Sequence, residues 1–284
     1  MNENVGLVLE GGGMRGVYTA GALECFLEHN AFFPYVIGVS AGASYGASYM
    51  SQQAGRNKKV SLDYVTDPRY MSWRNFRQTG QFFGMDFIYN QIPNNMVPFD
   101  YEAFYANEAE FKIGATDIQT GESIFYGKED YKDELLKALE ASSSLPFLAP
   151  VVDFKGRKLL DGGISDPIPL KLAQKDGNTK NVVILTRNLG YRKSKSRFAF
   201  FVKRKYPQFT GLQQAMQARY KLYNETLEYV EQEEKKGNIF VIRPQEKLIV
   251  GRMERDHKKL ENLYMQGYRD AKKALKRMKE QAFI

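Results

Sequence analysis

The chain has 284 residues, of which 43% are hydrophobic and 26% are charged, and this balance is ordinary for a globular protein with a buried core. Its single cysteine, Cys25, excludes an internal disulfide and a cysteine-based metal cluster, and we expect it to be a buried structural thiol. The first residues lack a basic stretch and a long apolar run, so we expect no signal peptide. We also expect no membrane-spanning helix, and hence a cytoplasmic protein, with peripheral contact to a membrane as an option.

The net charge of +8 is unevenly distributed. Residues 191–206 carry seven basic and no acidic side chains, and residues 252–280 carry ten basic and five acidic ones, so the rest of the chain is net negative. Phe198, Phe200 and Phe201 lie among the cations of the first stretch. We expect residues 191–206 to contact an anionic phospholipid surface rather than nucleic acid, because no groove-reading motif accompanies them. A solvated basic face is the alternative. No pattern indicates an oligomeric state.

The N-terminal part alternates strands and helices. Residues 5–10 predict a buried strand, 17–29 a helix, 35–39 a second strand, and the small residues from Ala41 onward a second helix. This order is typical of a parallel α/β sheet. Residues 55–105 break the alternation. They are rich in Asn, Gln, Pro and aromatic residues, and we interpret them as an insertion or a cap over the edge of the sheet, not as a domain of their own.

Strands and helices return after the insertion. The patterns predict strands at 111–117 and 122–126, a helix at 132–140, a hairpin at 151–160, a strand at 181–186, a helix at 212–235, a strand at 238–242 and a helix at 252–279. No segment resembles a linker. We therefore expect a single domain over 1–284, with a core at about 5–190 and a basic helical extension at 191–284.

Ser40 is the candidate nucleophile. It lies in Gly38-Val39-Ser40-Ala41-Gly42, a G-x-S-x-G motif between a predicted strand and a predicted helix. A serine on such a sharp turn presents its hydroxyl in a cleft, and the flanking glycines, Gly38 and Gly42, allow neighbouring backbone to pass closely. The start of the following helix favours developing negative charge.

A serine hydroxyl needs a base, and only two histidines are available. His29 ends a helix at the opposite end of the predicted sheet, and His257 lies among charges on the last predicted helix. Asp161 is better placed, because it follows an apolar strand and precedes the turn Gly162-Gly163. Asp166, in the same loop, is a weaker candidate for the base.

The glycine-rich segment Gly11-Gly12-Gly13-Met14-Arg15-Gly16 follows the first strand. It matches the dinucleotide-binding pattern, but the second strand does not end in the acidic residue that binds ribose in that site. Successive N–H groups of Gly12, Gly13 and Met14 form a concavity that suits an oxyanion. We expect Arg15 to tie the loop to the body by hydrogen bonds or to add positive charge.

These three motifs, in this order and spacing, resemble the patatin-like phospholipases, bacterial single-domain type, and so do the segments at 115–126 and 141–150. The resemblance covers roughly residues 5–190. It implies a three-layer α/β/α sandwich around a mainly parallel sheet. It also implies a Ser40–Asp161 dyad without histidine, metal or cofactor, and an oxyanion hole in the loop Gly11 to Arg15.

The motifs predict a serine hydrolase that cleaves lipid acyl esters, in the manner of a phospholipase A, a lysophospholipase or an esterase, through an acyl-enzyme. Acyl transfer to an alcohol acceptor requires the same residues and is the alternative within enzymes. A non-catalytic protein that binds a membrane surface is the alternative outside them. The intact serine, aspartate and glycine loop argue against a dead site.

Overall fold

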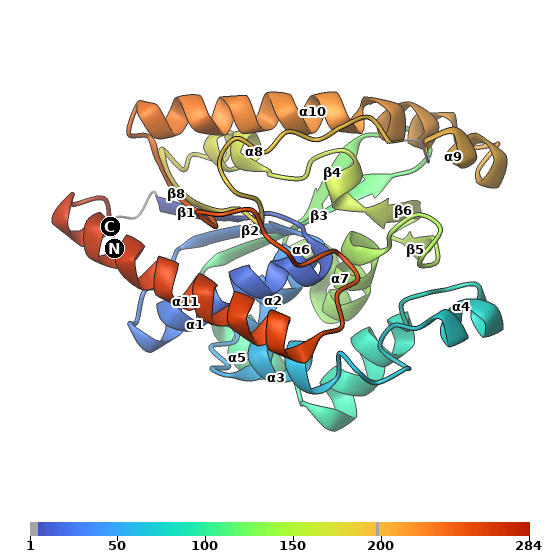
Figure 1. Ribbon diagram of the computed structural model, residues 1–284, viewed down its shortest axis with the longest axis horizontal. Coiled ribbons are helices and arrows are strands. Elements are labelled where there is room, and N and C mark those ends of the chain that lie inside the picture. The colour runs from blue at the N-terminus through green and yellow to red at the C-terminus, as the bar shows by residue number, and fades with distance from the viewer. Residues whose placement is uncertain (1–4, 197–198) are drawn as a thin grey trace.

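The computed structural model describes residues 5–196 and 199–284, and within them a mixed sheet of eight strands forms the centre (Figure 1). The strand order is β5-β6-β3-β2-β1-β7-β8, and β4 pairs with β3. The neighbours from β3 to β8 are parallel, whereas β3–β4, β3–β6 and β5–β6 are antiparallel. The strands are β1 (Val5–Leu9), β2 (Tyr35–Val39), β3 (Glu110–Asp117), β4 (Ser123–Tyr126), β5 (Val152–Phe154), β6 (Arg157–Asp161), β7 (Lys180–Ile184) and β8 (Ile239–Ile242).

Helices cover both faces of this sheet. In Figure 1, α8 (Leu170–Lys175) and α10 (Thr210–Lys235) lie above it, and α1 (Val17–Glu28), α2 (Ala41–Met50) and α11 (His257–Glu280) lie below. Alternate residues of β1 serve the two cores: Leu7 packs with the residues of α1 and α11, and Val8 packs with those of α8 and α10. The predicted three-layer α/β/α arrangement around a mainly parallel sheet is confirmed.

Helices α1 and α11 pack unusually closely. A Cβ atom on Gly21 would lie 1.9 Å from the carbonyl oxygen of Tyr264, and a Cβ on Gly267 would lie 1.9 Å from that of Tyr18. The Tyr18 hydroxyl also donates a hydrogen bond to Asp270 Oδ2 at 2.8 Å. The last helix is therefore held against α1 by backbone contact as well as by its apolar stripe.

Residues 55–105 form α3 (Arg56–Asp63), α4 (Trp73–Thr79), the π-helix η2 (Phe87–Met96) and α5 (Tyr101–Ala106). Of these elements, α3 packs on α1 and α2, α5 packs on α2, and η2 packs on α7 (Leu135–Ser143). None of the three lies over an edge strand, so the interpretation as a cap over the sheet edge is wrong in its placement. The aromatic residues of the insertion find apolar partners on the helical layer, which the exposed backbone of a sheet edge does not supply.

The remaining elements are η1 (Gly13–Gly16), α6 (Lys128–Tyr131), η3 (Lys132–Glu134), η4 (Gly162–Ile164) and α9 (Ala199–Lys205). The last helix begins at His257 rather than at 252, because the Asp256 side chain accepts a hydrogen bond from Lys259 N and caps it there. Helix α9 occupies part of the basic stretch 191–206, of which Arg197 and Phe198 lie outside the described residues. No helix in the described ranges has the length and apolar character that spanning a bilayer requires.

Candidate active site

Strands β2 and β6 meet end to end along one side of β3. Val39, the last residue of β2, pairs with Gly114, and Asp161, the last residue of β6, pairs with Ala115, the next position on β3. Strand β4 occupies the opposite side of β3 at these positions. Because β2 and β6 run in opposite directions, both end at this junction, and the junction brings the Ser40 turn and the Asp161 turn together.

Ser40 stands on a strained turn between β2 and α2. Its φ is 55° and its ψ is −128°, a region that residues with a side chain rarely adopt, and the residue is 7% exposed. A Cβ on Gly42 would lie 2.6 Å from the carbonyl oxygen of Leu9, so the turn can pack on the end of β1 only with glycine there. Gly38 packs in the same way against the backbone of Ala43.

The end of α7 holds both turns through hydrogen bonds. Ser40 N–H donates to Ser142 Oγ at 2.8 Å, and that hydroxyl donates to the carbonyl of Gly114 at 2.6 Å. Two residues further on, the carbonyl of Ser144 accepts the Asp161 N–H at 2.8 Å. Ser142 and Ser144 therefore fix the nucleophile turn and the aspartate turn relative to each other.

Asp161 is buried, with 3% exposure, and its Oδ1 accepts a hydrogen bond from Gly163 N–H at 2.8 Å. Gly162 lies at the strand junction, where a Cβ would lie 2.3 Å from the carbonyl oxygen of Gly114. Asp166 lines neither of the cavities at Ser40 described below, although burial raises its pKa to about 6. Both histidines are exposed, His29 at the end of α1 and His257 at the start of α11, and neither lines these cavities.

The glycine loop lies beside Ser40, since a Cβ on Gly11 would lie 3.1 Å from Ser40 Cβ. The Met14 N–H donates to the carbonyl of Arg252 at 3.1 Å, so it is not free for an oxyanion. The N–H groups of Gly12 and Gly13 make no hydrogen bond within the described ranges. Gly16 packs against Ala41 and Tyr45 on α2.

Arg15 does not tie the loop to the body as we expected. Its Nε is buried and has no hydrogen-bond partner in the described part of the chain, and the side chain lines a cavity beside Ser40. Burial and the nearby Arg252 and Arg187 lower its pKa to about 10. Its contribution to the site is therefore positive charge.

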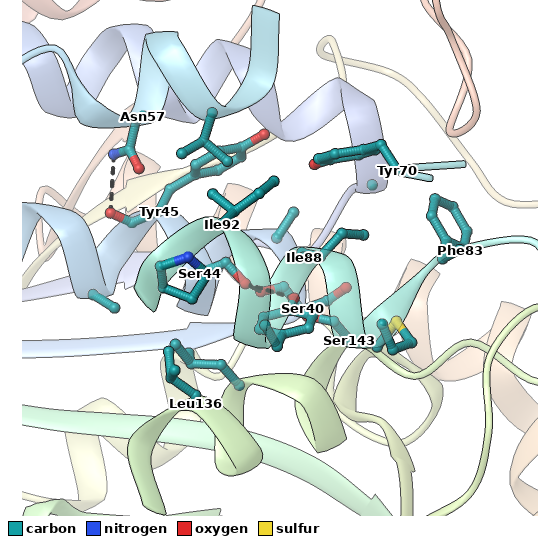
Figure 2. Close-up of a pocket in the computed structure, with 18 of the residues that line it drawn as sticks. Ser40, Ser44, Tyr45, Asn57, Tyr70, Phe83, Ile88, Ile92, Leu136 and Ser143 are labelled. Atoms are coloured by element: carbon teal, nitrogen blue, oxygen red, sulfur yellow. Dashed lines mark hydrogen bonds between the residues drawn. The ribbon is translucent and has the colours of Figure 1, made fainter. Parts of the chain in front are cut away.

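An apolar cavity of ≈ 120 Å³ opens on one side of Ser40 (Figure 2). Its walls come from the loop and α2, from the insertion and from α7. Ile88 and Ile92 of η2 point into it, and Leu136 of α7 lies opposite them (Figure 2). The Tyr89 hydroxyl hydrogen-bonds Ser44 Oγ at 3.0 Å on the same wall. Such a lining suits a hydrocarbon chain.

A second, smaller cavity of ≈ 30 Å³, the cationic cavity, opens on the other side of Ser40. Asp161, Gly11 and Gly12 line it together with Ser40. Five basic side chains complete its wall, namely Arg15, Arg187, Lys193, Arg219 and Arg252. Ser40 and Gly13 line both cavities, so the candidate nucleophile lies where an apolar and a charged compartment meet.

The comparisons with known proteins cover most of the sheet and the whole of this junction. Residues 7–173 match the family model described as patatin-like phospholipase, and residues 209–282 match a domain of unknown function. The chain belongs to the patatin-like phospholipase family. The family match includes Ser40, Asp161 and the glycine loop, whereas four of the five basic residues of the cationic cavity follow it in the sequence.

Several curated patatin-like or related sequences are similar to this chain. An uncharacterized protein, YjjU, from Escherichia coli is 31% identical over 64% of this chain and 52% of its own length. The mouse 1-acylglycerol-3-phosphate O-acyltransferase Pnpla3 is 27% identical over 58% of this chain and 40% of its own length. The lysophospholipase NTE1 of Meyerozyma guilliermondii is 28% identical over 62% of this chain, which corresponds to 12% of that protein. The chain thus spans about half or less of the length of these relatives.

Among solved structures, VipD from Legionella pneumophila aligns over 96% of this chain and 67% of its own, with a TM-score of 0.46 and 14% identity.

Proposed function

We propose that this patatin-like chain hydrolyses acyl esters of lipids through Ser40 and Asp161. The observation that carries the proposal is the position of Ser40 between the apolar cavity and the cavity lined by Asp161. The ester carbonyl lies at Ser40, the acyl chain in the apolar cavity and the rest of the lipid on the Asp161 side. The similarity to the NTE1 lysophospholipases supports a lipid ester as substrate.

The chemistry proceeds in two steps. Asp161 accepts the proton of the Ser40 hydroxyl while Oγ attacks the carbonyl carbon, and the N–H groups of Gly12 and Gly13 stabilise the oxyanion. The bond to the leaving alcohol breaks, and that alcohol takes the proton from Asp161. Asp161 then deprotonates a water molecule, which attacks the acyl-enzyme, and Ser40 regains the proton as the fatty acid leaves.

A fluorophosphonate probe followed by peptide mapping tests the nucleophile whatever the natural substrate is. We expect the wild type to be labelled at Ser40 and Ser40→Ala to remain unlabelled. Turnover of a nitrophenyl ester should fall by about 10³-fold or more in Asp161→Asn, the range seen when a catalytic base is removed. His29→Ala and His257→Ala should keep most of it. Labelling at another serine, or a folded but inactive His257→Ala, would refute the dyad.

Acyl transfer is the second candidate, and the similarity to the acyltransferase Pnpla3 favours testing it. It differs only in whether water or an alcohol reaches the acyl-enzyme. Product analysis with and without a lysolipid acceptor separates the two. Free fatty acid in both incubations supports hydrolysis, and a new diacyl product supports transfer.

A further inference from the structure

The cationic cavity has more basic than acidic side chains in its wall, five against the two carboxylates of Glu10 and Asp161. Among the described residues, none of its five basic side chains, those of Arg15, Arg187, Lys193, Arg219 and Arg252, forms an ion pair, although thirteen salt bridges occur elsewhere. Buried or half-buried cations are normally paired. Four guanidinium groups and one amine without an ion pair around one small space favour an anionic ligand.

The two acidic groups of the cavity, Glu10 and Asp161, accept hydrogen bonds from neutral groups and not from its basic side chains. Both Glu10 oxygens accept hydrogen bonds, one from the Tyr223 hydroxyl at 2.6 Å and the other from the backbone and hydroxyl of Thr186. Asp161 accepts the Gly163 N–H. Arg219 Nε donates to the carbonyl of Gly163, which leaves its terminal nitrogens for another acceptor.

The basic side chains of the cavity also disfavour one another's charged forms. Burial together with the neighbouring Arg219 and Arg252 lowers the pKa of Lys193 to about 6. Burial and Arg252 lower the pKa of Arg219 to about 10. The ammonium of Lys193 lies over the ring of Tyr223, 4.4 Å from its centroid. An anion in the cavity would reverse these shifts.

The size and place of the cavity restrict the anion. Its volume of ≈ 30 Å³ exceeds the roughly 10–15 Å³ that one water needs, so it has room for a small polar group but not for an acyl chain. It shares Ser40 with the apolar cavity, which places such an anion a few bonds from the reacting ester.

We propose that the cationic cavity binds the phosphate of the substrate's head group, so that the enzyme prefers esters in which a phosphate lies close to the cleaved bond. Lys193, Arg219 and Arg252 are the binding residues, and all three follow the patatin-like segment of the chain. The proposal rests on the proposed function and extends it, because it assigns head-group recognition to the C-terminal part.

The test uses a pair of ether lipids that the enzyme does not cleave, 1-alkyl-glycerol 3-phosphate and 1-alkyl-glycerol, titrated calorimetrically into the Ser40→Ala variant. The phosphate lipid should bind about 10–100-fold more tightly, the effect of one or two hydrogen bonds to charged groups. Adding Lys193→Gln or Arg252→Gln should remove most of this preference. Lys272→Gln, which removes one exposed positive charge that does not line the cavity, should keep it.

Equal binding of the two lipids, or an unchanged preference in both cavity variants, overturns the proposal. Inorganic phosphate is the third ligand. If it binds to the wild type and the cavity variants lose that binding while the lipids are not distinguished, the cavity is a site for free phosphate and the proposal fails. Failure of the proposed function is seen separately, as absence of fluorophosphonate labelling at Ser40, because the ether-lipid titration requires no catalysis.

Discussion

The backbone of Ser40 stores strain in the native state. A residue with a side chain at φ 55° and ψ −128° costs about 1–3 kcal/mol, and glycine in its place loses about 0.5–1 kcal/mol through chain entropy. We therefore expect Ser40→Gly to unfold a few degrees above Ser40→Ala, although both variants lack turnover. Differential scanning calorimetry measures the difference. A lower melting temperature for Ser40→Gly would mean that the turn is not strained.

Lys193 should couple anion binding in the cationic cavity to the uptake of a proton. With its pKa lowered to about 6, this amine is mainly neutral at pH 7, and a bound anion raises the pKa toward the ordinary value. Binding of sulfate, which does not titrate near neutral pH, should therefore take up a proton at pH 7, up to about one per site. The other charged and titratable groups that face this amine across the cavity are Arg15, Arg187, Arg219, Arg252, Glu10, Asp161, Tyr191 and Tyr223.

Calorimetry in two buffers of different ionisation enthalpy measures this uptake. It should be absent in Lys193→Gln and should fall in the wild type as the pH drops below 6, where the amine is already charged. Equal uptake in the variant and the wild type would assign the proton to another group.

The turns that carry Ser40 and Asp161 were predictable because glycine-flanked turns after apolar strands are local patterns, and the catalytic roles of the two residues stay predictions. The supporting residues were not. Ser142 and Ser144 act through one hydroxyl and one carbonyl, and a serine triplet at a helix end gives no signal of that geometry. The cavity cations come from segments far apart in sequence, so only the fold shows that they converge.

At the scale of elements, the contact between α1 and α11 leaves no space for a side chain at Gly267. Gly267→Ala should lower the free energy of unfolding by about 1–3 kcal/mol, the usual cost of overpacking, even though alanine favours a helix. Gly251→Ala is the matched control, because open space surrounds that glycine. Urea denaturation measures both. A Gly267→Ala variant as stable as the wild type would show that the helices are not in backbone contact.

Helix α9 carries the exposed cations Lys203, Arg204 and Lys205, with Phe201 half exposed beside them, while Val202 packs into the body. Contact with an anionic membrane through residues 191–206 stays a prediction. Replacing the three cations by Gln should weaken binding to phosphatidylglycerol vesicles, since each cation near such a surface contributes roughly 1 kcal/mol. Sedimentation with these vesicles in low and high salt measures the binding.

The exposed surface of α4 is an alternative site for membrane contact. Trp73 on α4 is 64% exposed, and its ring contacts Phe82, which contacts Phe83 on the wall of the apolar cavity. If Trp73→Ala reduces vesicle binding and the triple Gln variant does not, the membrane contact lies at α4 and the prediction for α9 is wrong.

The strands and long helices were predictable from periodicity, whereas the structure and placement of residues 55–105 were not. Residues 55–105 combine short helices with a π-helix that contains Pro93, and such elements depend on the apolar surface they cover rather than on a repeat in their own sequence. Helix α9 was missed for a related reason, because its charges concealed the buried position Val202.

At the scale of the whole molecule, α10 and α11 cover opposite faces of the sheet, which favours the single-domain prediction. A truncation to residues 1–190 would expose Tyr18 and Leu23 on one face and Val8 and Ile37 on the other. We expect it to aggregate or to bind a hydrophobic dye, and to lose labelling by the fluorophosphonate probe. A soluble truncation that unfolds cooperatively and is still labelled would show that the first 190 residues form a domain of their own.

The pairing of α1 with α11 also has a consequence for synthesis. The hydroxyl of Tyr18 and the carboxylate of Asp270 are 252 residues apart in the chain. At translation rates of about 5–20 residues per second, α1 waits roughly 10–50 s for its partner. During that time its apolar face is exposed to other nascent chains and to chaperones. The backbone contact between Gly21 of α1 and Tyr264 of α11 therefore forms last. This protein completes its fold only after nearly all of the described chain has been made.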